Sequence, residues 1–163
     1  NPAGRLPVSV PRSVGQLPVY YDRQLPEPHD YVEMQASPLY PFGYGLSYTR
    51  FDYSDLKVTG QPGGKYRVSF DISNVGNYDG DEVAQLYMTE DYASVVLPVR
   101  QLKHFLRIHL RKGETRQVSF MLTPYDFSLI NKDMKRVVEP GDFEIQIGSS
   151  SADIRLHTKL SVQ

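Results

Sequence analysis

The residues best suited to chemistry are the acids of one short turn, Asp79-Gly80-Asp81-Glu82. Three carboxylates within four residues could form a cation site or an acid pair for proton transfer. A hard cation would require more oxygen ligands than this turn offers, and Asp and Gly are also the residues that turns select. We therefore interpret the segment as a turn that caps two strands, with its acids in solvent, and predict no metal site.

Histidine offers a second kind of site, but the spacing of the histidines matches no metal-binding motif. We interpret His109 as a solvent-facing strand residue and His157 as a cross-strand contact. His29 is best interpreted as a solvated loop residue, although its place beside Asp30 would also suit a surface switch. The sequence has no Gly-x-Ser-x-Gly nucleophile motif and no phosphate-binding glycine loop, so we predict no cofactor. The four histidines are His29, His104, His109 and His157.

Aromatic side chains offer a third chemistry, because the apolar face of a sugar stacks on an exposed ring. Tyr92 is a weak candidate for binding substrate, since it lies in a predicted long loop at 90–99, and loops often carry binding residues. The candidates for such a platform are Tyr20, Tyr21, Tyr31, Tyr40, Tyr44 and Tyr92.

The rings of Pro38–Phe51 suit a structural role better, because Gly43 and Gly45 alternate there with large aromatic residues. Glycines among aromatic residues favour a sharply bent backbone that presses the rings together. We therefore predict a packed seam between two domains, with tyrosine hydroxyls at its wet edge. Its members would be Tyr40, Phe42, Tyr44 and Tyr48.

Residues 1–50, called the leader below, differ in composition from the rest of the chain. Eight of the twelve prolines lie within residues 1–48, which disfavours helices and central strands, apart from a short strand such as Pro18–Tyr21. The segment also has too many apolar and aromatic side chains for a solvated linker. We expect an extended, proline-rich segment that packs on another domain.

From Phe51 onward, apolar residues recur with a period of two, which is typical of half-buried strands. The first strand changes face between Tyr53 and Leu56, which suggests a bulge, and 82–89 is apolar on both faces, as in a central strand. Turn residues separate about seven or eight short strands. We predict an all-β, immunoglobulin or fibronectin type III-like Greek-key sandwich over 51–163, without a convincing helix.

Composition excludes several classes of function. The formal net charge is −1, from 18 basic and 19 acidic residues, so we expect no nucleic-acid partner. No apolar run has the length of a transmembrane helix, so we expect no membrane partner. The chain has no cysteine, which excludes disulfides and thiolate metal sites.

Several motifs together carry a family resemblance. Pro41-Phe-Gly-Tyr-Gly-Leu-Ser-Tyr48 resembles the signature that ends the second domain of family 3 glycoside hydrolases, the β-glucosidase and β-xylosidase group. Asn1–Pro7 and Gly15–Tyr21 resemble the run that precedes this signature. Further motifs resemble the fibronectin type III-like domain that ends these enzymes: Asn74-Val-Gly76, Gly80–Tyr87, Pro98, Gly113-Glu114 and Glu139-Pro-Gly141.

The resemblance implies that 1–50 is the tail of the second hydrolase domain with a linker, and that 51–163 is the fibronectin type III-like domain. It implies retaining hydrolysis of terminal non-reducing β-D-glucosyl or xylosyl residues by the complete enzyme. The two catalytic carboxylates would lie upstream, so we assign no catalytic residue here. The implied partners are the upstream catalytic domains, in the same polypeptide or a separate chain, and the implied location is periplasmic or secreted. Oligosaccharide would be bound only through the complete enzyme.

Two alternatives stay open. The sandwich could be a free-standing module that binds carbohydrate or protein, although the buried-type side chains of the leader argue against this. The chain could also be a fragment of a longer one, which is compatible with the first interpretation.

Overall fold

The structure is a computed structural model that describes residues 1–24, 30 and 33–163, and its regular elements are almost all β-strands. The only helical element among these residues is a short 3-10 turn, η1, at Val14–Gln16. The strands are β1 Phe51–Gln61, β2 Lys65–Asn74, β3 Gly80–Glu90, β4 Gln101–Leu110, β5 Thr115–Leu122, β6 Ser128–Ile130, β7 Arg136–Val138, β8 Gly141–Ser150 and β9 Asp153–Val162.

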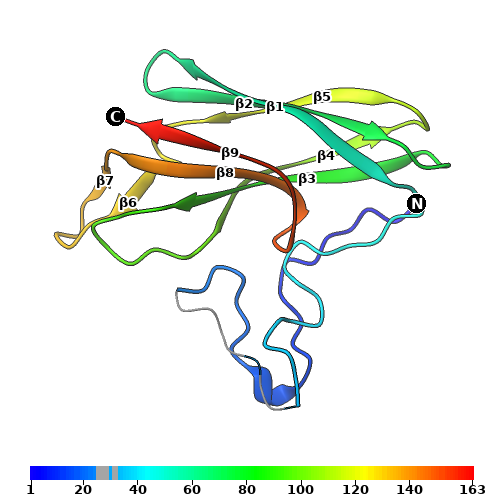
Figure 1. The fold of residues 1–163 in the computed structure, drawn as a ribbon, viewed down its shortest axis with the longest axis horizontal. Coiled ribbons are helices and arrows are strands. Elements are labelled where there is room, and N and C mark those ends of the chain that lie inside the picture. The colour runs from blue at the N-terminus through cyan, green and yellow to red at the C-terminus, as the bar shows by residue number, and fades with distance from the viewer. Residues whose placement is uncertain (25–29, 31–32) are drawn as a thin grey trace.

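The strands form a sandwich of two antiparallel sheets, as Figure 1 shows. One sheet has the order β1-β2-β5 and the other has the order β4-β3-β8-β9. The chain crosses from one sheet to the other after β2, after β4 and again before β8, which is Greek-key connectivity. Strands β6 and β7 form a small separate hairpin at one end of the sandwich. The predicted all-β sandwich is thus confirmed.

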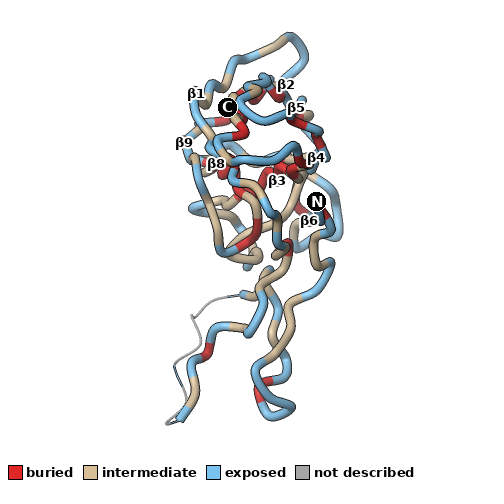
Figure 2. Tube along the Cα trace, turned by 90° about the vertical axis from the view of Figure 1, so that its right-hand side faces the viewer, coloured by how far each residue is buried: buried red, intermediate tan, exposed pale blue. Residues whose placement is uncertain are grey.

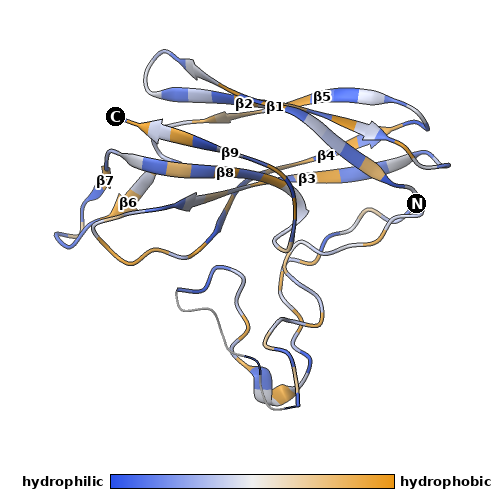
Figure 3. Cartoon of the chain, viewed as in Figure 1, coloured by the Kyte–Doolittle hydropathy of each residue, from blue (hydrophilic) through white to orange (hydrophobic). Residues whose placement is uncertain are grey.

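The core lies between the two sheets and follows from the alternation in the sequence. On β2, Val68, Phe70 and Ile72 are fully buried, while the residues between them are at least partly exposed. Figure 3 shows this alternation of apolar and polar positions along the strands. Because a strand points successive side chains to opposite faces, each strand contributes every second residue to one core.

Strand β3 is buried on both faces, as predicted for a central strand. Ala84 and Leu86 belong to the core between the sheets, whereas Gln85 and Tyr87 are buried on the opposite face. The predicted bulge in β1 is also confirmed, because the pairing with β2 shifts between Ser54 and Lys57.

The leader is not simply extended, because its two halves pair with each other. The amides of Leu6 and Val10 donate to the carbonyls of Tyr44 and Tyr40, each at 2.8 Å. The predicted strand at Pro18–Tyr21 is absent, since this segment forms no ladder in the structure. Figures 1 and 2 show that the described part of the leader follows an irregular path, touches the sandwich and otherwise projects away from it.

Candidate functional site

The base of the leader meets the outer face of the β4-β3-β8-β9 sheet through a cluster of three rings. The ring of Tyr21 stacks on that of Phe42, with centroids 4.1 Å apart, and meets the edge of Tyr87 on β3 at 6.1 Å. The Tyr21 hydroxyl accepts a hydrogen bond of 3.2 Å from the amide of Leu102. Phe42, a predicted seam residue, therefore packs against the sandwich of its own chain.

Gln85 anchors the same contact through its buried side-chain amide. Its Nε2 donates to the carbonyls of Gly43 at 3.2 Å and Ser149 at 2.6 Å, and its Oε1 accepts from the Tyr87 hydroxyl at 2.5 Å. Gly43 has a φ of +79°, and a Cβ there would collide with the Gln85 amide. Glycine is thus required twice, for its backbone conformation and for the close approach of β3.

A buried ion pair forms a second link between leader and sandwich. Glu82 on β3 is only 2% exposed, and its carboxylate accepts from Arg5 at 2.6 Å and from the Tyr53 hydroxyl at 2.7 Å. Burial raises the pKa of Glu82, while the Arg5 guanidinium and the Tyr53 hydroxyl partly offset that rise. The expectation that all the acids of this turn lie in solvent is wrong for Glu82, because the leader covers it.

The other acids of the turn are held by donors of the protein. Asp81 accepts from His109 at 2.5 Å and from Arg107 Nε at 2.7 Å, and the hydrogen bond from His109 is the main cause of its lowered pKa. Asp79 accepts from the amide of Lys112 at 2.7 Å, which supports the cap interpretation. Among the residues that the structure describes, no group of three His, Cys, Asp or Glu side chains could hold a metal ion.

The remaining predicted seam residues do not share one site. The rings of Tyr40 and Tyr44 contact each other with centroids 5.1 Å apart, whereas Tyr48 is 74% exposed. The projecting part of the leader also exposes large apolar side chains, including Leu17 at 61%. These side chains border a concave, largely apolar surface that encloses a volume of about 760 Å³. It is lined by Pro7, Val8, Ser9, Leu17, Pro18, Val19, Tyr20, Tyr21, Asp22 and Phe42.

Tyr92 lies where the sequence places it, in the loop between β3 and β4, and it is 86% exposed. His157 contacts Glu144 on the neighbouring strand at 3.0 Å, as predicted for a cross-strand residue. His104 stacks on Phe120 in the other sheet. The candidates His29 and Tyr31 lie outside the described residues.

Sequence reasoning missed Arg5, Gln85 and Tyr87 as members of the leader contact. The sequence does contain a weak indication for two of them. Gln85 and Tyr87 lie on the second face of β3, and a segment other than the opposite sheet must cover that face. Arg5 gave no signal, because its partner lies 77 residues away in the sequence.

Comparison with known proteins agrees with this architecture. Residues 82–151 match the fibronectin type III-like domain family. A putative β-xylosidase of Formosa agariphila is 42% identical over 159 residues, which covers 95% of this chain and 21% of that protein. A periplasmic β-glucosidase of Salmonella typhimurium is 41% identical over 169 residues, with 95% and 22% covered.

Solved structures of β-glucosidases are similar to this chain as well. A mutant β-glucosidase from Listeria innocua, in complex with laminaribiose, superposes with a TM-score of 0.89 at 34% identity, over 99% of this chain and 24% of that one. A β-glucosidase from Erythrobacter marinus gives 0.92 at 37% identity, over 99% and 22%. The chain corresponds to the C-terminal portion of family 3 glycoside hydrolases.

The match to these relatives and solved structures includes most of the leader, since it covers 95% of the chain for the putative β-xylosidase and 99% for the Listeria innocua structure. The chain spans about a fifth of the length of the curated relatives that it matches. No helix in the described part of the chain is long and apolar enough to cross a membrane.

Proposed function

We propose that this chain is the non-catalytic C-terminal part of a β-glycosidase that removes terminal β-linked glucosyl or xylosyl residues. Its role is structural: the sandwich buttresses the catalytic domains, and the leader, over 1–50, completes the surface of the second of them. The relatives are named β-glucosidase and β-xylosidase, which supports this class of substrate. A relative named as periplasmic supports a periplasmic or secreted location.

The observation that carries the proposal is the unburied apolar surface of the leader. Leu17 is 61% exposed and Tyr20 is 66% exposed, at the border of the concave surface that the sandwich does not reach. Exposed apolar patches of this kind mark interaction sites. The upstream domains fit this surface, because about four-fifths of the length of each relative lies outside the match to this chain. The same exposure disfavours a free-standing binding module.

A chimera tests the proposal. The matching C-terminal portion of the Salmonella typhimurium β-glucosidase is replaced either by this chain or by residues 51–163 alone. We expect hydrolysis of an aryl β-glucoside with the full chain, little with the sandwich alone, and little when Leu17→Asp and Tyr20→Asp are introduced together. The isolated chain should hydrolyse neither aryl β-glucosides nor aryl β-xylosides. Turnover by the isolated chain, or equal activity of all the chimeras, would refute the proposal.

A further inference from the structure

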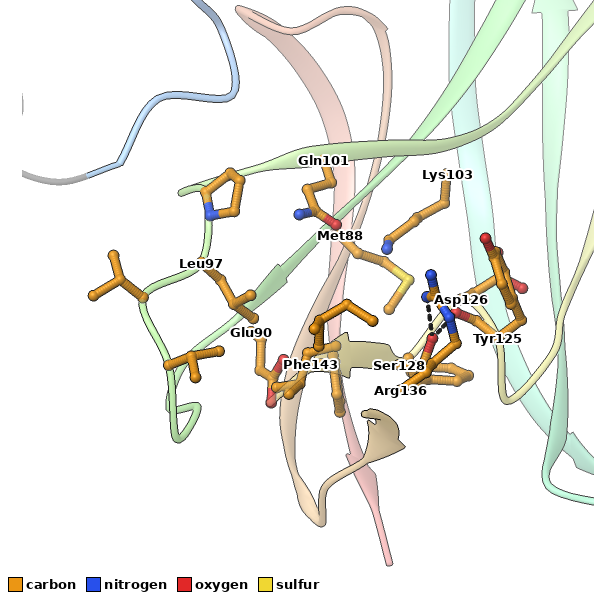
Figure 4. Close-up of a pocket in the computed structure, with 16 residues that line it drawn as sticks. Met88, Glu90, Leu97, Gln101, Lys103, Tyr125, Asp126, Ser128, Arg136 and Phe143 are labelled. Atoms are coloured by element: carbon orange, nitrogen blue, oxygen red, sulfur yellow. Dashed lines mark hydrogen bonds between the residues drawn. The ribbon is translucent and has the colours of Figure 1, made fainter. Parts of the chain in front are cut away.

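A second cavity lies at the end of the sandwich that carries the β6-β7 hairpin. It has a volume of about 490 Å³ and is bordered by the loop after β3, the start of β4 and the hairpin, as Figure 4 shows. Its apolar walls come from Met88, Val95, Val96, Leu97, Pro98, Phe127, Leu129, Ile130 and Phe143. A cavity of this size is large enough for a small organic ligand.

Polar groups without partners line this cavity. The Oε1 atom of Glu90 is buried and has no hydrogen-bond partner. Lys103 and Gln101 also line the cavity, and no hydrogen bond or ion pair joins either side chain to another residue in the described ranges. Buried polar groups are normally satisfied, and leaving one without a partner costs about 1–3 kcal/mol. One buried carboxylate oxygen without a partner, beside an amide and an ammonium group that line the same cavity, therefore points to a ligand here.

Glu90 and Lys103 influence each other electrostatically but do not form an ion pair. Burial raises the pKa of Glu90, and the charge of Lys103 partly offsets that rise. Burial also lowers the pKa of Lys103. The two side chains belong to neighbouring strands, β3 and β4, with the cavity open to both of them. A ligand that donates to the Glu90 carboxylate and accepts from the Lys103 ammonium would bridge the space between the two side chains.

The charge of the lining indicates which ligand fits. Glu90 and Asp126 are balanced by Lys103 and Arg136, so the cavity has no excess of either sign. Asp126 already accepts from the backbone amide and the hydroxyl of Thr123, and Arg136 donates to Ser128 and lies over the ring of Tyr125. The groups left for a ligand are thus one acceptor, one cationic donor and one amide beside an apolar wall.

We propose that this cavity binds a neutral polyhydroxylated ring, a mono- or disaccharide, between Glu90, Gln101 and Lys103. Each sugar hydroxyl can both donate and accept, so adjacent hydroxyls satisfy the carboxylate and the ammonium together. The apolar face of the ring lies against the walls formed by residues such as Leu97 and Phe143. The inference does not depend on the proposed function.

The test uses the isotope-labelled 163-residue chain and NMR titration with D-glucose, D-xylose and cellobiose, up to about 20 mM. We expect saturable shifts confined to residues 88–103 and 125–136 and to Phe143. Lys103→Met and Glu90→Gln should each weaken binding about tenfold, as loss of a charged hydrogen bond would. The matched controls Lys112→Met and Asp52→Asn, at exposed positions outside the cavity, should leave the affinity unchanged.

Three outcomes would overturn the inference. The first is the absence of shifts with every sugar, and the second is binding that Lys103→Met and Glu90→Gln leave intact. The third is tighter binding of a zwitterion such as β-alanine, which would assign the cavity to another class of ligand. Dispersed spectra of each variant establish that it is folded, so a lost affinity can be attributed to the cavity. Failure here would leave the chimera experiment unaffected.

Discussion

The guanidinium of Arg5 lies 2.6 Å from the carboxylate of Glu82, and this pair joins the start of the leader to the central strand of the sandwich. The Arg5 side chain is 12% exposed and that of Glu82 is 3% exposed, so solvent cannot stabilise either charge alone. A buried charge that loses its partner keeps its full cost of desolvation. The folded chain therefore keeps its full stability only when the leader holds Arg5 beside Glu82.

Arg5→Met should lower the free energy of unfolding by about 3 kcal/mol, because it leaves Glu82 buried without its cation. The measurement is the midpoint of urea unfolding of the 163-residue chain. Arg67→Met is the matched control, since Arg67 is exposed on β2 and should change stability by less than about 0.5 kcal/mol. Adding Glu82→Gln to Arg5→Met should recover part of the loss. Equal effects of Arg5→Met and Arg67→Met would show that the pair is unimportant.

Gly43→Ala should destabilise the chain more than Gly63→Ala. The two glycines have nearly the same φ, +79° and +77°, so both substitutions incur a similar backbone cost of about 1 kcal/mol. Only at Gly43 does the added Cβ meet the buried amide of Gln85, whereas nothing lies near it at Gly63. The difference between their unfolding midpoints isolates the contact with β3. Identical midpoints would mean that Gln85 moves aside without cost.

The sandwich could be predicted from the sequence because its signals are local. On β2, Val68, Phe70 and Ile72 repeat every second residue, and this period alone decides which face is buried. Strand β6 could not be predicted, since three residues with one buried side chain, Leu129, are too few to show a period. The local pattern thus defines the long strands and misses β6.

The leader contact could be predicted only in part, because its partners are distant in sequence. The glycines and rings of 38–51 indicate close packing, yet which surface receives Phe42 depends on Tyr21 and Tyr87. Likewise, the sequence around Glu82 is typical of an exposed turn. In the structure, Arg5, which is 77 residues earlier, covers Glu82. Burial of a charge is a tertiary property that composition and spacing do not encode.

Asp81 and Glu82 are adjacent, yet they should affect stability with opposite dependence on pH. The pKa of Asp81 is lowered from its ordinary 3.8, so the stability that it contributes is present above that value and is lost as the pH falls through the lowered pKa. The pKa of Glu82 is raised from its ordinary 4.5, so its contribution is present below that value and is lost as the pH rises through the raised pKa.

Urea unfolding of the wild type, Asp81→Asn and Glu82→Gln between about pH 3 and pH 7 checks this prediction. The advantage of the wild type over Asp81→Asn should grow as the pH rises, because the carboxylate then accepts from His109 and Arg107. Its advantage over Glu82→Gln should shrink over the same range, because the charged form is the one that burial disfavours. If both stability differences changed in the same direction with pH, the environments assigned to Asp81 and Glu82 would be wrong.

Tyr92→Ala tests whether the loop between β3 and β4 takes part in binding substrate. Its ring is almost fully exposed at the loop, where it is free to stack on a sugar of the complete enzyme. Loss of one ring contact of about 1 kcal/mol should raise KM roughly fivefold with little change in kcat. The measurement uses the active chimera with an oligosaccharide substrate. Tyr78→Ala is the control, because Tyr78 is also exposed and lies in the turn before β3. An unaltered KM for Tyr92→Ala, or an equal rise for both variants, would remove Tyr92 from the substrate site.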